Sequence, residues 1–89
     1  MNGNTVPRAN PDIICQNVNY EMVLVSPQSG HYQVINQVGA TIWGLIDGKR
    51  TISEIKRALV NQYDIPADQA LQDILAFLTS LETRGLIKA

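Results

Sequence analysis

The stretch YQVINQVGATIWGLIDGKRTISE, residues Tyr32–Glu54, is the most informative part of this chain. Its first four residues, 32–35, favour a strand because they are rich in aromatic and β-branched side chains. After Asn36 the apolar spacing becomes that of a helix, and Gly48 suits a left-handed helix end. A second helix is predicted to begin at Thr51. A strand followed at once by two helices indicates a small α+β domain.

Two strand-like segments precede this stretch. Residues 21–26 (EMVLVS) are rich in Val and Leu, and residues 13–16 could form a shorter strand. Turn residues 27–30 (PQSG) separate residues 21–26 from residues 31–35; Pro fixes φ there and Gly accepts a positive φ. We therefore expect a hairpin within a three-stranded antiparallel sheet.

Three helices are expected after the hairpin. The first carries one apolar stripe: Val38, Ile42, Leu45 and Ile46. The second starts with TISE, a capping box in which Thr51 and Glu54 bond each other's amides, and its stripe is Ile52, Ile55, Leu59 and Tyr63. The third starts near residues 64–66, where Pro suits a first turn, and stops at Gly85.

The third helix has an unusually wide apolar face. It spans roughly 160° of the helical wheel, whereas an ordinary surface helix presents about 100°. Two interpretations follow: the helix lies centrally in a small core, or one edge is left for a partner, since exposed apolar surface often marks a binding site. The apolar positions are Ala67, Ala70, Leu71, Ile74, Leu75, Phe77, Leu78 and Leu81.

Composition predicts one small domain. The chain has 89 residues, 45% hydrophobic and 17% charged. Residues 1–11, with two prolines, one glycine and three asparagines, are expected to bury nothing and form a flexible tail before a domain at 12–89. The chain has no apolar run long enough for a membrane helix and no secretory h-region, and its one cysteine, Cys15, fits a reducing compartment. We therefore expect a cytoplasmic protein without a membrane partner.

Charge argues against a nucleic-acid partner, because the net charge is −1 and the sequence pI about 5.6. The order of elements nevertheless suits a winged helix, and Lys49, Arg50, Lys56 and Arg57 form a small basic patch. A winged-helix DNA-binding protein therefore remains an alternative. A small dimerising structural module is another, if the apolar edge of the third helix pairs with itself.

Candidate chemistry is sparse. His31 and Cys15 are the only residues of their types, and no third group would orient a base, so no catalytic residues, metal site or cofactor are expected. Asp73 lies at the margin of the apolar face beside Phe77 and Arg84. It could form a surface ion pair or meet a charged residue of a bound peptide. Trp43 lies off the stripe of the first helix, where a second core anchor is the favoured interpretation.

The ordered set of residues from the hairpin to the chain end resembles the PqqD-like family, the RiPP recognition elements. The resemblance implies a winged-helix-like α+β fold, with a three-stranded antiparallel sheet packed on three helices. It also implies a non-catalytic adaptor that binds the leader of a ribosomally made precursor peptide for a modifying enzyme or leader peptidase, as in lasso-peptide or pyrroloquinoline quinone biosynthesis. The matching residues are Tyr32, Val34, Asn36, Gly39, Ile42, Trp43, Asp47, Gly48, Thr51, Glu54, Ile55, Leu59, Tyr63, Asp73, Ile74, Phe77, Leu78, Leu81, Gly85, Leu86 and Ile87.

The resemblance also implies where the leader binds. Members of the family take it as an added strand, in the cleft between the third strand and the third helix, here residues 31–35 and 67–84. Either edge of that helix could face the cleft, Leu71 with Leu75 or Ala70 with Phe77, and we favour the former. The expected peptide-binding residues are His31, Tyr32, Gln33, Val34, Ile35, Asp68, Leu71, Asp73, Ile74, Leu75 and Leu78.

Overall fold

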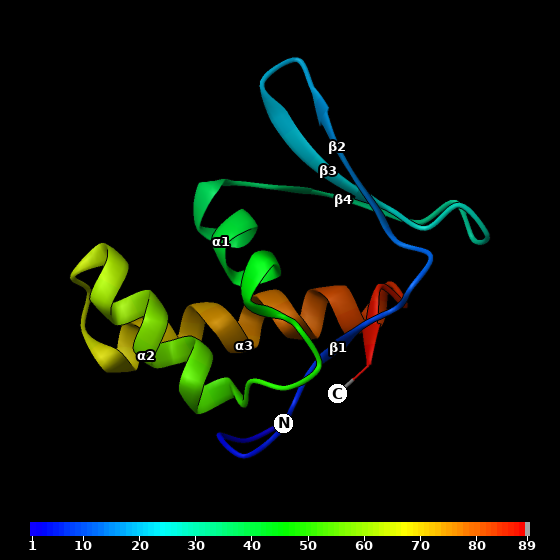
Figure 1. Cartoon of the computed structure of the whole chain (residues 1–89). Coiled ribbons are helices and arrows are strands. Elements are labelled where there is room, and N and C mark those ends of the chain that lie inside the picture. Colours follow the sequence, from blue (N-terminus) through cyan, green and yellow to red (C-terminus); the bar gives the residue numbers. More distant parts are fainter. Residues whose placement is uncertain (89) are drawn as a thin grey trace.

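A three-stranded antiparallel sheet stands above three helices in the computed structural model, which describes residues 1–88 (Figure 1). The strands are β2 (Ile14–Val18), β3 (Glu21–Val25) and β4 (Tyr32–Ile35), in the order β2-β3-β4. The helices are α1 (Gln37–Leu45), α2 (Ile52–Tyr63) and α3 (Ala67–Thr83). A separate pair of short strands, β1 (Arg8–Ala9) and β5 (Ile87–Lys88), joins the two ends of the chain. The predicted α+β, winged-helix-like fold is confirmed.

Two tight turns connect the sheet. The predicted turn between β3 and β4 is confirmed: Ser26 N–H donates to the His31 carbonyl over 2.8 Å, and Gly30 has a φ of 75°. Between β2 and β3 the chain turns through Asn19 and Tyr20, whose φ values are 51° and 69°. Two successive left-handed residues are typical of a type I′ hairpin, which sequence analysis missed because Tyr20 is an uncommon residue there. As a result, β2 extends to Val18.

The first helix ends earlier than predicted. Asn36 caps its start, since the Asn36 side chain accepts the Gly39 N–H over 2.8 Å. Gly48 does not end the helix, however: α1 stops at Leu45, and Ile46 already has an extended backbone. Gly48 instead takes its left-handed conformation within the following turn. There the Asp47 carboxylate accepts two backbone N–H groups over 2.9 Å each, which lowers the Asp47 pKa.

The predicted capping box of α2 is confirmed. Thr51 N–H donates to Glu54 Oε1 over 3.0 Å, and Glu54 N–H donates to Thr51 Oγ1 over 3.2 Å. The bond from Thr51 N–H lowers the Glu54 pKa. The predicted stripe is also correct, with Ile52, Ile55 and Leu59 fully buried and the Tyr63 hydroxyl bonded to Thr41 Oγ1 at 2.7 Å.

The predicted end of α3 at Gly85 is confirmed. Gly85 has a φ of 72° and its N–H donates to the Glu82 carbonyl, while Leu86 N–H donates to the Leu81 carbonyl over 2.9 Å. These two bonds are those of a Schellman motif. The motif reverses the chain, so that β5 returns along the helix end.

The core explains the wide apolar face of α3. This helix runs through the centre of the domain, below the sheet and beside α2 (Figure 1), which confirms the central interpretation. Trp43 packs against the core at its edge, as expected of a second anchor. None of the helices in residues 1–88 has both the length and the apolar character needed to cross a membrane. The buried apolar residues are Leu24, Ile35, Ile42, Ile46, Ile52, Ile55, Leu59, Ala70, Ile74, Leu78, Leu81, Leu86 and Ile87.

The N-terminal segment packs against the domain. Pro7 is buried, and residues 8–9 pair with β5. The carbonyl of Thr5 accepts the Ile52 N–H over 2.9 Å, and that of Gly3 accepts the Ser53 N–H over 3.0 Å. The expectation that residues 1–11 bury nothing is therefore wrong. The physical reason is that the first N–H groups of a helix have no partner within it, and these carbonyls satisfy two of them in α2.

Deleting residues 1–9 should therefore destabilise the protein. The two hydrogen bonds to α2, each worth about 1 kcal/mol, are lost together with the β1–β5 pairing and the burial of Pro7, so the free energy of unfolding should fall by more than about 2 kcal/mol. Urea denaturation followed by circular dichroism measures the change. Deletion of Met1 and Asn2 alone is the control, because both are exposed. Equal midpoints for the two deletions would contradict a packed N-terminal segment.

Candidate functional site

β4 is an edge strand with one unpaired side. It pairs with β3 alone, in the register Val25↔Tyr32 and Val23↔Val34. Hydrogen-bonded and non-hydrogen-bonded pairs alternate along an antiparallel ladder. Ser26 and His31 form a hydrogen-bonded pair, so the pairs that contain Tyr32 and Val34 are not hydrogen-bonded. The N–H and C=O groups of Tyr32 and Val34 therefore point away from β3. We call this side of β4 the free edge.

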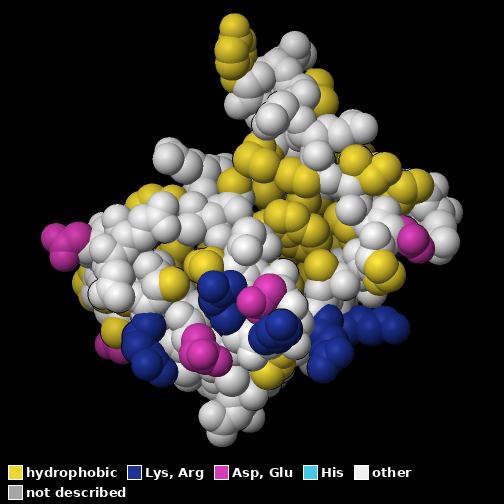
Figure 2. All heavy atoms as spheres, viewed as in Figure 1, with side chains coloured by type: hydrophobic (Ala, Val, Ile, Leu, Met, Phe, Trp, Pro, Cys, Tyr) yellow, Lys and Arg dark blue, Asp and Glu magenta, His cyan; other side chains and the backbone are white. Residues whose placement is uncertain are grey.

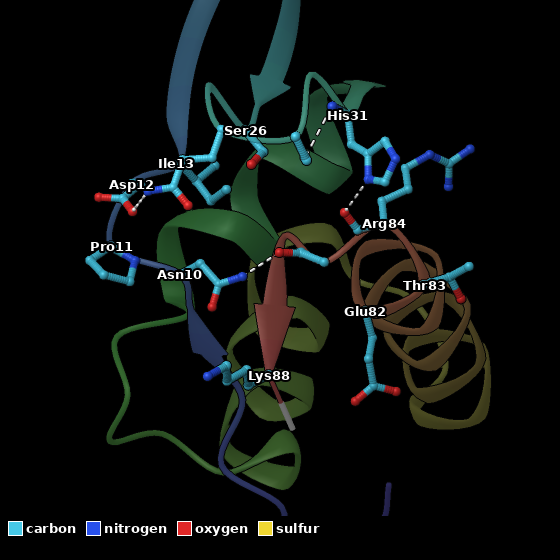
Figure 3. Close-up of a pocket in the computed structure, with 13 residues that line it drawn as sticks. Asn10, Pro11, Asp12, Ile13, Ser26, His31, Glu82, Thr83, Arg84 and Lys88 are labelled. Carbon is cyan, nitrogen blue, oxygen red and sulfur yellow. Dashed lines mark hydrogen bonds between the residues drawn. The ribbon is translucent and has the colours of Figure 1, made fainter.

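The alternate side chains of β4 attach the strand to α3. His31 Nδ1 lies 3.0 Å from the Arg84 carbonyl, and Ser80 Oγ donates to Gln33 Oε1 over 3.0 Å. Figure 3 shows the imidazole of His31 over the end of α3. At the other end of the strand, a Cβ on Gly39 would lie 3.2 Å from both Ile35 and Phe77, so glycine permits the close approach of α1. β4 thus runs alongside the C-terminal half of α3, in the opposite direction.

A groove lies between β4 and α3. This β4–α3 groove has a volume of about 610 Å³, within the range of natural ligand sites. Residues 30–34 form one wall, and Ser80 and Arg84 form the other. At Val34 the groove meets a second cavity, the hairpin-tip cavity, whose other residues come from the β2–β3 turn, the end of β4 and the start of α1: Tyr20, Glu21, Met22, Ile35, Asn36, Gln37 and Ala40.

The edge of α3 that faces β4 is not the predicted one. Contacts with β4 come from Ser80 and Arg84, and Phe77 lies on the same side. At 3.6 residues per turn, Leu75 lies about 160° around the helix from Phe77, and neither Leu71 nor Leu75 lines the groove. The preference for the Leu71–Leu75 edge is therefore wrong. Polar side chains of β4 instead contact polar residues on the Phe77 edge of α3. The apolar pattern does not specify how α3 is rotated about its axis.

The other predicted site residues are divided between groove, core and surface. The structure brings His31, Tyr32, Gln33 and Val34 together along the groove. Asp73 lies farther along α3, in a small cavity with Asn36, Val38, Gly39, Ile42, Ala76 and Phe77, which we call the α1–α3 cavity.

Four predicted residues lie elsewhere. Ile74 and Leu78 are 0% exposed and Ile35 5%, so these three belong to the core, and Ile35 also borders the hairpin-tip cavity. Asp68 is exposed and lines none of these three cavities. Sequence reasoning missed the role of Ser80 and the wall position of Arg84. Their spacing from Phe77, three and seven residues, is the signal that places all three on one helix face.

The outer face of the sheet is apolar and uncovered. Alternation along the strands places its side chains opposite to buried Leu24 and Ile35, away from the helices. Four of them are exposed by 44% to 62%: Ile14, Val18, Tyr32 and Val34. In Figure 2 the visible Lys and Arg side chains lie at the end of the molecule away from the β2–β3 hairpin. Exposed apolar clusters of this kind mark interaction surfaces.

The two candidate nucleophile and base residues are far apart in the sheet. Cys15 lies on β2 and His31 beside β4, with β3 between them. Within residues 1–88, no three His, Cys, Asp or Glu side chains gather as metal ligands.

Comparison with known proteins agrees with this geometry. The family described as coenzyme PQQ synthesis protein D (PqqD) matches residues 21–87. No curated protein sequence matches the chain. Among solved structures, a lasso peptide synthetase B1 complexed with its leader peptide is 27% identical, with a TM-score of 0.81 over 96% of this chain and 100% of the other.

Two further structures share the fold. TbiB1 in complex with the TbiA(beta) leader peptide is 24% identical, with a TM-score of 0.79 over 92% of this chain and 95% of TbiB1. The PqqD part of Methylobacterium extorquens PqqCD, described as a stand-alone RiPP recognition element, is 23% identical, with a TM-score of 0.82 over 99% of this chain and 94% of the other. The family model matches residues 21–87, and the three-stranded sheet and three helices are shared with the PqqD structure. The chain therefore belongs to the PqqD family of RiPP recognition elements.

Proposed function

We propose that this protein binds the leader segment of a ribosomally made precursor peptide as an added strand on the free edge of β4. The observation that carries the proposal is the unpaired backbone of Tyr32 and Val34 beside the β4–α3 groove. An extended peptide gains main-chain hydrogen bonds at such an edge, and its alternate side chains enter the groove. The structures of the lasso peptide synthetase B1 and of TbiB1, each in complex with a leader peptide, support a leader as the ligand of this chain.

We further infer that the protein is a non-catalytic adaptor for a modifying enzyme or leader peptidase, in a lasso-peptide or related pathway. The apolar outer face of the sheet supports this inference, because binding of the leader at the edge leaves this face uncovered. A partner enzyme can therefore dock there while the leader is held. Neither a nucleic acid nor a cofactor is needed for this function.

Strand addition depends on the backbone of Val34. Val34→Pro removes an N–H that points to the free edge and should reduce leader binding at least tenfold, because the added strand loses a ladder bond and meets the ring. Fluorescence polarisation with a labelled candidate leader peptide measures the affinity. Val34→Ala keeps the N–H and is the matched control. A folded Val34→Pro protein with unchanged affinity would exclude strand addition.

The outer face should matter for the enzyme rather than for the leader. Ile14→Lys combined with Val18→Lys places charge on the strand farthest from β4, where both side chains are already exposed. Leader affinity should stay within about twofold, whereas the rate of precursor processing by the partner enzyme should fall about tenfold, equivalent to about 1.4 kcal/mol. Unchanged processing would remove this face as the docking surface.

The adaptor should carry no reaction of its own. The isolated protein is expected to leave the precursor mass unchanged in mass spectrometry, and Cys15→Ala with His31→Ala should keep partner-dependent turnover at saturating precursor. Some loss of leader affinity is acceptable, since His31 bonds the Arg84 carbonyl. A double variant that binds leader yet abolishes turnover would instead indicate catalysis by the adaptor.

A further inference from the structure

Formal charges are segregated along the free edge. The β4–α3 groove, at the start of β4, contains one formally charged side chain, Arg84. The charged side chain of the hairpin-tip cavity, Glu21, belongs to β3 and therefore lies across β4 from the free edge. The α1–α3 cavity, which shares Asn36 with the hairpin-tip cavity, contains one charged side chain, Asp73. On the α3 side of the free edge, the guanidinium of Arg84 therefore lies near the start of β4 and the carboxylate of Asp73 lies beyond its end.

These charges are not neutralised by ion pairs within residues 1–88, where the single ion pair joins Arg50 to Asp47. Arg84 uses only Nη1, which donates to the Ser80 carbonyl over 3.3 Å and to Ser80 Oγ over 2.6 Å. Asp73 accepts one bond, from Gln69 Nε2 to Oδ1 over 2.9 Å. Both groups keep hydrogen-bonding capacity for a charged partner, since a guanidinium has five donors and a carboxylate about four acceptor positions.

We propose that the bound peptide is recognised by charge order: a basic residue lies toward Asp73, and an acidic residue lies toward Arg84. This inference rests on the proposed leader binding at β4 and adds the class of peptide that the edge selects. Charged groups at a binding edge suppress peptides of the wrong sign, because like charges brought together across an interface are costly. The two ends of the edge thereby also fix the register of the added strand.

The geometry gives the spacing and the direction. Asp73 and Arg84 are eleven residues apart on one helix, or about 16 Å at about 1.5 Å per residue. A strand covers that length in about five residues, so the two peptide charges should be about four to six residues apart. Every pairing in the sheet is antiparallel, and antiparallel addition is the more stable kind. A peptide antiparallel to β4 begins at the Asp73 end, so its basic residue comes first.

A purely structural role makes a different prediction. Asp73 lies in the α1–α3 cavity near the first turn of α1, where a carboxylate is favourable, and Arg84 caps the end of α3, where a cation is favourable. Those roles stabilise the fold but give no preference for the order of charges in a peptide. Peptide selection separates the two roles.

The test uses a phage-displayed library of random 14-residue peptides, selected on the wild-type protein. Enriched peptides whose binding is lost in Val34→Pro are synthesised, each with a twin in which the basic and acidic residues are exchanged. The wild type should prefer the original over the twin by about tenfold, with a smaller preference at high salt. Arg84→Glu with Asp73→Lys, which leaves the net charge unchanged, should reverse the preference. Arg57→Glu, on the exposed face of α2, is the control and should not.

Each outcome bears on the inference. One result would overturn the charge-order inference and leave strand addition intact: the selected peptides need the Val34 N–H but show no charge order. A preference that is unchanged in the Arg84→Glu, Asp73→Lys variant would do the same. A library that yields no peptide sensitive to Val34→Pro would overturn strand addition and this inference with it. If thermal unfolding shows that the double variant is not folded, Arg84→Glu alone applies, because Arg84 is exposed. The Arg84→Glu variant should no longer select an acidic residue in the peptide. If it still does, the inference is overturned.

Discussion

The attachment of β4 to α3 is the interaction on which the rest of the site depends. His31 and Gln33 hold the strand to the end of the helix by hydrogen bonds, and Ile35 anchors its other end in the core. Because alternate residues of a strand face opposite sides, these contacts leave the side chains of Tyr32 and Val34 exposed on the outer face, and the ladder directs their backbone groups to the free edge. The same geometry therefore creates the groove and keeps it open.

The features that sequence predicted are those set by neighbouring residues. The capping box at Thr51, the turn before Gly30 and the left-handed Gly85 are each specified within a few residues, so local chemistry suffices. The prediction of Gly48 as a helix end failed, although Gly48 has the expected backbone. Ile46 is buried and already extended, so packing of that side chain ends α1 earlier than the glycine would.

The features that sequence did not predict depend on distant parts of the chain. The N-terminal segment looked unable to pack because it is rich in proline, glycine and asparagine. Its carbonyl groups nevertheless contact the start of α2, and carbonyl groups are the same in every sequence. The rotation of α3 was likewise undetermined. Its apolar arc covers both candidate edges, and only the polar contacts of β4 with Ser80 and Arg84 decide which edge faces the strand.

An adaptor must hold many copies of a peptide in turn, so strong binding without selectivity would be of little use. Backbone hydrogen bonds at an edge strand are the same for any extended peptide, and therefore they supply affinity but little discrimination. Discrimination has to come from side chains along the edge, which here are few and mostly uncharged. In such a site a single unpaired charge at each end has a large effect on which peptide, and which register, is favoured. The sparse chemistry of this edge is thus consistent with selective binding.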